Sequence, residues 1–168
     1  MEWKEELQQH TKEAEKVVQG YLPEETGHQK LLIEASNYSV LVGGKRLRPM
    51  IMLESFKAFG GTGNVVEPFM AALEMIHSGS LVHDDLPCMD NDEYRRGNLT
   101  TWKKYGYDMA VLAGDKLFIY AFETAAKAFA LTDRADLVGK AISILANKAG
   151  IYGMIGGQSV DVEYTDRP

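Results

Sequence analysis

The sequence has one cysteine, no long hydrophobic run and no basic stripe, and each of these absences excludes a class of protein. Cys88 cannot form a disulfide within the chain, which is typical of a reducing compartment and predicts a cytoplasmic protein. The longest apolar run, 117–122, is much shorter than the roughly 20 residues of a membrane span. Residues 1–6 are too acidic and polar for a signal peptide, so we expect a soluble protein.

Positive charge is also scarce. The 168 residues include 18 Lys and Arg against 24 Asp and Glu, which gives a net charge of −6. Because no basic stripe is interleaved with aromatic residues, the composition argues against a nucleic-acid partner. Hydrophobic residues make up 45% of the chain, which is enough to form the core of one globular domain.

The spacing of apolar residues predicts an all-α fold, and no segment shows the clean alternation of a strand. We expect Asn64 to cap the fourth helix, with Glu67 completing a capping box, and Asp108 to cap a fifth helix that is apolar on nearly every face. In chain order, the predicted helices cover about 2–20, 27–42, 49–59, the stretch after Asn64 as far as the acidic cluster described next, 109–131 and 135–164.

Carboxylates gather where the fourth helix is expected to end. The segment 84–96 holds five acidic and two basic residues: Asp84, Asp85, Asp90, Asp92, Glu93, Arg95 and Arg96. Crowded carboxylates repel one another unless a cation lies among them, and hard oxygen ligands select Mg²⁺ or Mn²⁺. Because the adjacent arginines need an anion, the segment predicts a diphosphate site bridged by a metal ion.

Two further residues shape this predicted site. Pro87 cannot donate a helical hydrogen bond, so we expect it to end the helix and let Asp90 fold back toward Asp84. His77 precedes Asp84 by seven residues, which places both within about 20° on one helix face and about 10 Å apart along the axis. A lone histidine on such a face is more often a core residue than a ligand, so both interpretations of His77 stay open.

A basic segment precedes the third helix. Lys45, Arg46 and Arg48 lie next to Pro49, and proline is favoured at the first position of a helix. Free amides, the helix dipole and three cations would then converge, which favours a phosphate site. The alternative is a basic loop that only solubilises the start of the helix.

Two aspartates lack an evident role. Asp115 lies in an apolar context and needs a partner that the sequence does not identify. Asp161 continues a helix face of small residues, and a structural or a functional carboxylate would fit there equally well. The small residues of that face are Ala146, Gly150, Gly153 and Gly157.

Five motifs in this order resemble those of the trans-prenyl diphosphate synthases of the farnesyl and geranylgeranyl type. The motifs are Gly43–Pro49, His77, Asp84–Asp90 with Arg95–Gly97, Leu112–Asp115 and Gly156–Asp161. The resemblance runs from about residue 38 to the end of the chain. It implies an antiparallel helical bundle of the isoprenoid synthase type, with 1–168 as the N-terminal part of its single domain and a homodimer when full length.

The resemblance also implies a reaction and a set of roles. The family joins an allylic diphosphate to isopentenyl diphosphate, head to tail, and releases pyrophosphate with the help of Mg²⁺. Asp84 and Asp90, with Asp85 as a weaker candidate, would hold the metal ions. Arg95 would bind the allylic diphosphate. The implied isopentenyl diphosphate site consists of Gly44, Lys45, Arg48, His77 and Arg96.

The resemblance further bears on product length and completeness. Gly79 and Ser80 are small where short-chain synthases often carry a large aromatic residue, which favours a geranylgeranyl product, with farnesyl next. The family's second aspartate-rich motif, preceded by a Lys-Thr pair, is missing, and Asp161, Glu163 and Asp166 do not reproduce it. We therefore expect this chain to be an N-terminal fragment that is inactive alone.

Three other interpretations remain at this stage. The adjacent pair His83 and Asp84, with His28 and His77 upstream, would fit a helical HD-type metal phosphohydrolase. A class I terpene cyclase shares the aspartate chemistry but needs no isopentenyl diphosphate site. A non-catalytic regulatory subunit of a prenyl synthase would fit a naturally short chain.

Overall fold

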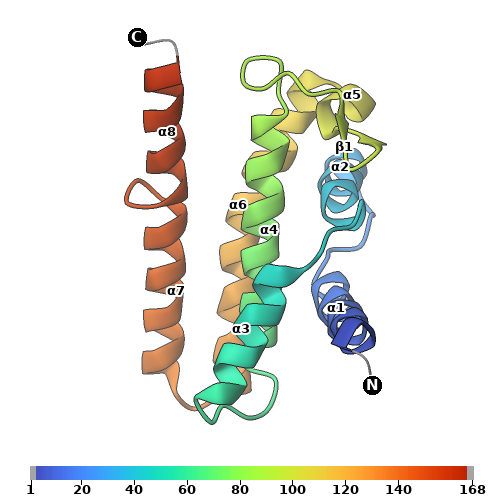
Figure 1. Ribbon diagram of the computed structural model, residues 1–168. Helices are drawn as coiled ribbons and strands as arrows, with labels where there is room; N and C mark the ends of the chain where they lie inside the picture. Colours follow the sequence, from blue (N-terminus) through green and yellow to red (C-terminus); the bar gives the residue numbers. More distant parts are fainter. Residues whose placement is uncertain (1–2, 166–168) are drawn as a thin grey trace. The chain divides into compact units, whose positions relative to one another are not determined.

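The computed structural model describes residues 3–165, and the chain divides into two compact units, residues 1–128 and 129–168. The prediction of an all-α fold is confirmed, since the described strands form one short antiparallel hairpin (Figure 1). Unit 1 holds α1 (Trp3–Gly20), α2 (Lys30–Leu41), α3 (Leu47–Ala58), α4 (Glu67–Asp84), β1 (Tyr94–Arg95), β2 (Asn98–Leu99), α5 (Thr101–Tyr105) and α6 (Tyr107–Ala126). The 3₁₀-helix η1 (Lys127–Leu131) follows α6, and unit 2 holds α7 (Ala135–Ala149) and α8 (Met154–Thr165).

Helix α4 is the centre of unit 1. It packs against α1, α2, α3 and, most extensively, α6. The two long helices lie side by side in Figure 1. Small buried residues on both helices let the backbones approach closely, with Leu117 of α6 against Gly79 of α4. Met70 of α4 belongs to a core cluster with Ala14, Met50 and Val66. The cluster of carboxylates follows the C-terminal end of this central helix.

Several helix starts differ from the sequence-based expectation. Helix α4 begins at Glu67 with Val66 as N-cap, and no side chain caps it, so the predicted Asn64 capping box was wrong. The backbone carbonyl of Asn64 instead accepts a hydrogen bond from the Glu67 N–H at 3.0 Å, which closes a turn before the helix. Asp108 is not a cap either, because α6 already begins at Tyr107.

Helix α6 is buried on one face only. Its small residues and Leu117 face α4, whereas Leu112 and Ile119 are 50% and 72% exposed. The prediction of an apolar helix buried on nearly every face was therefore wrong. The apolar sequence reflects one packed face plus exposed aliphatic residues, which periodicity alone does not distinguish from full burial.

Unit 2 contains two helices where the sequence predicted one from 135 to 164. Gly150 adopts an extended conformation (φ −83°, ψ −152°) and ends α7. A Cβ on Gly153 would collide with the backbone of Lys148, so glycine permits a close backbone approach at this break. Figure 1 shows α8 continuing beyond the loop in about the direction of α7. The expected face of small residues is thus interrupted, and two of its glycines, Gly150 and Gly153, serve the break.

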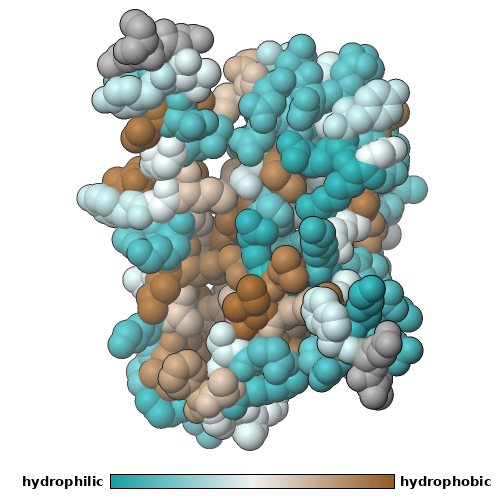
Figure 2. All heavy atoms as spheres, in the orientation of Figure 1, coloured by the Kyte–Doolittle hydropathy of each residue, from teal (hydrophilic) through white to brown (hydrophobic). Residues whose placement is uncertain are grey.

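The end of unit 1 that carries α5 and the hairpin has a mainly hydrophilic surface (Figure 2). Exposed aliphatic side chains occur on α3, where Leu47 and Ile51 are 45% and 64% exposed. Within residues 3–165, none of the helices is both long and apolar enough to cross a membrane.

Candidate functional site

The carboxylates lie where α4 ends and the chain turns back. Asp85 is the C-cap of α4, and Pro87 follows in a tight turn. The Asp90 N–H donates a hydrogen bond of 2.8 Å to the Asp84 carbonyl, and Asn91, at φ 55°, continues the turn. The prediction that the chain folds Asp90 back toward Asp84 is confirmed.

The electrostatics of these carboxylates are unfavourable without a cation. Burial raises the pKa of Asp84, and the nearby charge of Asp90 raises it further, while Arg95 offsets only part of the effect. Burial, with the charges of Asp92 and Asp90, raises the pKa of Asp85 despite the hydrogen bond and charge of Arg95. Both shifts indicate a site where an additional positive charge would be stabilised.

The predicted ligands differ in their availability to a metal ion. Asp85 accepts a hydrogen bond of 2.8 Å from Arg95 Nε and forms an ion pair of 2.6 Å with Nη2, whereas within residues 3–165 Asp84 and Asp90 make no such ion pair. In the part of the chain that the structure describes, no three His, Cys, Asp or Glu side chains are grouped to hold a metal. Mg²⁺ is commonly held by one or two carboxylates together with water and substrate phosphates, so Asp84 and Asp90 fit a shared ion.

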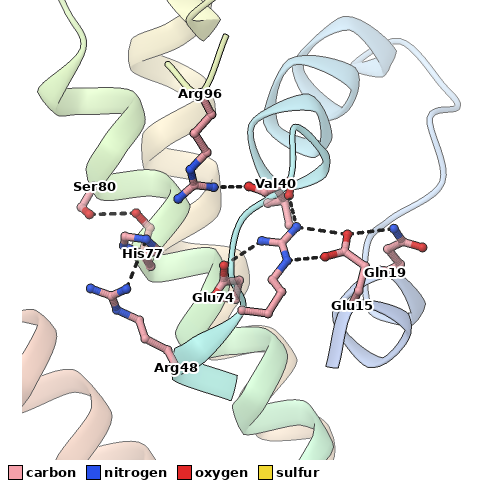
Figure 3. A network of polar contacts seen from close by, with 10 residues as sticks. Glu15, Gln19, Val40, Arg48, Glu74, His77, Ser80 and Arg96 are labelled. Carbon is pink, nitrogen blue, oxygen red and sulfur yellow. Dashed lines mark hydrogen bonds and ion pairs between the residues drawn. The ribbon is translucent and has the colours of Figure 1, made fainter. Parts of the chain in front are cut away.

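His77 belongs to the basic side of the site. Its Nε2 lies 3.4 Å from Nη1 of Arg48, at the exposed start of α3. Burial and the charge of Arg48 lower the pKa of His77, which favours a neutral imidazole that accepts a hydrogen bond from the guanidinium. Figure 3 shows Arg48 and Arg96 approaching this stretch of α4 from either side.

Arg46 does not join the cations of the predicted phosphate site. The residue is 2% exposed, and its side chain donates to Glu15, to Glu74 and to the Val40 carbonyl. The residue has a left-handed backbone (φ 49°), which turns it away from its neighbours Lys45 and Arg48. The prediction of three basic side chains at the start of α3 was therefore wrong for one of the three.

The adjacent Arg95 and Arg96 connect the acidic and basic groups. Arg95 pairs with Asp85 beyond the end of α4. Arg96 donates to the carbonyl of Gly43 and covers Gly44, where a Cβ would collide with its guanidinium. One hairpin therefore contacts both the end of α4 and the loop that precedes α3.

This combination was compared with known proteins. A family model described as polyprenyl synthetase matches residues 29–168. The chain belongs to this family. Among the relatives, the chloroplastic geranylgeranyl pyrophosphate synthase of Catharanthus roseus is 49% identical over 129 residues, and the farnesyl diphosphate synthase of Micrococcus luteus is 44% identical over 135 residues.

The chain spans only part of these relatives. The matches cover 77% and 80% of this chain but 36% and 45% of the two relatives. A solved structure, an FPP/GFPP synthase from Zymomonas mobilis without ligand, matches with a TM-score of 0.89 and 34% identity. That match covers 97% of this chain and 58% of the solved one. The family resemblance and the helical fold predicted from the motifs are both confirmed.

In this polyprenyl synthetase chain, Gly79 and Ser80 have different surroundings. A Cβ on Gly79 would lie 3.2 Å from the Leu117 Cβ and 3.3 Å from the Gly114 carbonyl, so this glycine lies in the contact between α4 and α6. Ser80 is half-buried and donates to the His77 carbonyl at 2.8 Å. The small size of Gly79 has a packing reason, and Ser80 remains the candidate for limiting product length.

Residues at 111–115 of α6 contact His83, the histidine that directly precedes Asp84 and Asp85. His83 Nε2 lies 3.1 Å from the Val111 carbonyl and 3.7 Å from Asp115 Oδ1, and a Cβ on Gly114 would collide with the imidazole. The Asp115 side chain is 61% exposed, so it is not enclosed in apolar surroundings as expected. Asp161 is likewise exposed, on α8.

Sequence reasoning missed the residues that fix the loop after the aspartates. The Asp92 carbonyl accepts hydrogen bonds from the Thr100 hydroxyl and the Trp102 indole, both at 2.8 Å. Lys103 pairs with Glu93 at 2.6 Å. A lysine and a tryptophan shortly after an acidic loop are too common in sequences to indicate this role.

Proposed function

We propose that this polypeptide carries the substrate diphosphate sites of a Mg²⁺-dependent prenyl transfer that joins an allylic diphosphate to isopentenyl diphosphate. The observation that carries the proposal is that Arg95 pairs with Asp85, while the next residue, Arg96, donates to Gly43 in the loop that precedes α3. Two diphosphates bound on these two sides would be neighbours. A head-to-tail transfer needs that neighbourhood because its two substrates react with each other.

On the acidic side, Asp84 and Asp90 would hold the ion, and Arg95 would bind the allylic diphosphate. Bound Mg²⁺ would neutralise the negative charge that develops on the leaving diphosphate. Arg95 can contribute in the same way, although Asp85 already engages its Nε and Nη2. Asp85 would therefore orient Arg95, and we propose it as a metal ligand only after that ion pair opens.

On the basic side, Lys45, Arg48, His77 and Arg96 would hold isopentenyl diphosphate, with Gly44 admitting the phosphate close to the backbone. Lys45 and Arg48 are exposed and have free N–H groups to donate. In the reaction, the allylic C–O bond breaks with its electron pair leaving on the diphosphate. The isopentenyl double bond then forms the new C–C bond, and loss of a proton restores a double bond.

We further propose a geranylgeranyl product, with farnesyl as the next candidate. The proposal now depends on Ser80, because Gly79 faces α6. The sequence holds no second aspartate-rich motif. We therefore expect the 168 residues alone to give no detectable condensation, and we expect the homodimer and the cytoplasmic location only for a complete synthase.

The HD-type hydrolase has no support in the described residues. His77 contacts Arg48, and the histidines do not gather with the aspartates into a group that could hold a metal. A terpene cyclase is disfavoured because it binds no isopentenyl diphosphate, which would leave the basic side chains around Lys45 and Arg48 without a ligand. No observation specifically favours a regulatory subunit.

Calorimetric titration of the chain tests the proposal. Isopentenyl diphosphate is expected to bind without metal, and Lys45→Ala or Arg48→Ala to weaken it selectively. Inorganic pyrophosphate with Mg²⁺ is expected to bind in a manner that Asp84→Asn and Asp90→Asn abolish. The proposal would be overturned if the wild-type chain failed to bind isopentenyl diphosphate. It would also be overturned if the chain released phosphate from isopentenyl diphosphate.

A further inference from the structure

The buried guanidinium of Arg46 joins four helices at one point. Nε and Nη2 donate to the carboxylate of Glu15 on α1, and Nη1 donates to Oε1 of Glu74 on α4 at 2.7 Å. Nη2 also donates to the Val40 carbonyl on α2, and Arg46 itself is the N-cap of α3. Figure 3 shows Glu15, Glu74 and Val40 converging on this group from different elements.

Only arginine can make this set of contacts. The contacts use three nitrogens in a planar fork, whereas a lysine ammonium presents its donors from one atom. The side chains of Arg46 and Glu74 are 1% and 4% exposed, and that of Glu15 is 26% exposed. Although burial raises the pKa of Glu15, the hydrogen bond and charge of Arg46 leave it below its ordinary value, so the Glu15 carboxylate is an ionised partner of the guanidinium.

The anchor lies between the groups proposed to bind isopentenyl diphosphate. Lys45 and Arg48 flank Arg46 in sequence and are exposed, while Arg46 points inward. Glu74 lies one helical turn before His77 on α4, and His77 in turn contacts Arg48. One guanidinium therefore fixes both the turn that carries Lys45 and Arg48 and its distance from His77.

We propose that Arg46 is a positioning residue that holds Lys45, Arg48 and His77 in register for the diphosphate of isopentenyl diphosphate, through its pairing with Glu15 and Glu74. This inference rests on the proposed function of the same site. Arg46 does not touch the ligand, since each of its three guanidinium nitrogens already donates a hydrogen bond and the residue is buried.

Stability alone does not explain such a network. Replacing a buried ion network by well-packed apolar side chains of similar size is often neutral or stabilising, whereas removal of one partner leaves an unpaired buried charge. A charge-free variant, Arg46→Met with Glu74→Met and with Glu15→Gln at the partly exposed partner, therefore separates the two roles. It is expected to fold, yet to lose the contacts that set the turn.

The experiment measures two ligands on each variant by calorimetry, isopentenyl diphosphate and inorganic pyrophosphate with Mg²⁺, together with the melting temperature. Arg46→Lys and the charge-free variant are expected to bind isopentenyl diphosphate about 10-fold more weakly, the scale of one misplaced charged hydrogen bond. Pyrophosphate with Mg²⁺ is expected to bind as in wild type. Val18→Ala, at a fully buried position of α1, is the control that lowers stability without touching the network.

Each outcome is decisive. Wild-type affinity for isopentenyl diphosphate in the folded charge-free variant would show that Arg46 is only structural. Equal losses for both ligands, or a loss in Val18→Ala, would also overturn the inference. If neither Arg46 variant folds, the same two affinities are measured on Glu15→Gln, which changes the more exposed partner of Arg46. A selective loss of affinity for isopentenyl diphosphate in Glu15→Gln would support the inference, and wild-type affinity would overturn it. If wild type binds no isopentenyl diphosphate, the proposed function itself fails.

Discussion

Asp90 donates its backbone N–H to the carbonyl of Asp84 across 2.8 Å, so a main-chain hydrogen bond holds two like charges near each other. Burial and then Asp90 raise the pKa of Asp84, which means that the folded chain stabilises the ionised carboxylate less well than water does. A site of this kind is stabilised by a cation. The arrangement therefore exchanges some stability of the metal-free chain for affinity toward a divalent ion.

Asp90→Asn is expected to stabilise the metal-free chain at pH 7 by about 0.5 kcal/mol, the scale of partly exposed charge pairs. Between the ordinary Asp84 pKa of 3.8 and its raised value, the folded state binds more protons, so stability falls as the pH rises through this window. Denaturation with and without Mg²⁺ measures both effects. The exposed Glu6→Gln of α1 is the control, and a loss of stability in Asp90→Asn would contradict the argument.

The sequence predicted those features that depend on neighbours along the chain. Pro87 must interrupt the helical ladder, so the return of Asp90 followed from local rules. The order of the helices followed from apolar spacing in the same way. These are the parts of the fold and the site that the structure confirms.

Features that depend on distant partners could not be predicted. Arg46 and Arg48 are equivalent in the sequence, and what separates them is the pairing of Arg46 with Glu15 and Glu74, 31 and 28 residues away. In the sequence, the small size of Gly79 favoured a geranylgeranyl product, but Leu117 across the helix interface gives this glycine a packing reason. A pattern of charges and small residues does not reveal which side of a helix faces the core.

Acidification is expected to destabilise the chain through His77. Its pKa is lowered from 6.5, first by burial and then by Arg48, so the unfolded chain binds the proton more readily. The stabilising contribution is complete above pH 6.5 and is lost as the pH falls through the folded-state pKa. His77→Gln should lose less stability than wild type between pH 7 and pH 5 in urea denaturation. If the free energy of unfolding fell with pH equally in both proteins, this role of His77 would be excluded. Bound isopentenyl diphosphate should reduce the stability that wild type loses on acidification.

Gly79→Phe and Ser80→Phe are expected to differ in stability. A ring at position 79 must displace Leu117 and the backbone of Gly114, which costs about 2–3 kcal/mol or more. Ser80 is half-buried, so Ser80→Phe should change stability by less than about 1 kcal/mol. Melting temperatures measure this difference. Ser80→Phe in a complete synthase is then the variant that tests product length, and an unchanged product would remove the basis for the geranylgeranyl proposal.

Gly114→Ala is expected to displace His83, since the new Cβ would collide with the imidazole that lies beside the Val111 carbonyl. We expect a loss of about 1–3 kcal/mol and weaker Mg²⁺-dependent pyrophosphate binding, because His83 adjoins Asp84. Gly139→Ala is the matched control, since nothing lies within 4 Å of its new Cβ and an alanine in α7 favours the helix. Equal effects of the two substitutions would show that His83 does not need the space.

Lys116 is expected to destabilise the chain at neutral pH. Within the described residues its Nζ is buried without a hydrogen-bond partner, 4.5 Å from the centre of the Tyr120 ring, and burial lowers its pKa from 10.5 to about 8. Between those values the unfolded chain binds more protons, so stability rises with pH. Lys116→Met should therefore stabilise the chain at pH 7 by about 1 kcal/mol, allowing for partial exposure, and this gain should shrink toward pH 10.5. Lys12→Met, at an exposed position of α1, is the control and should show neither the gain in stability at pH 7 nor its decrease toward pH 10.5. If the stability gained by Lys116→Met did not depend on pH, packing and not charge would be its cause.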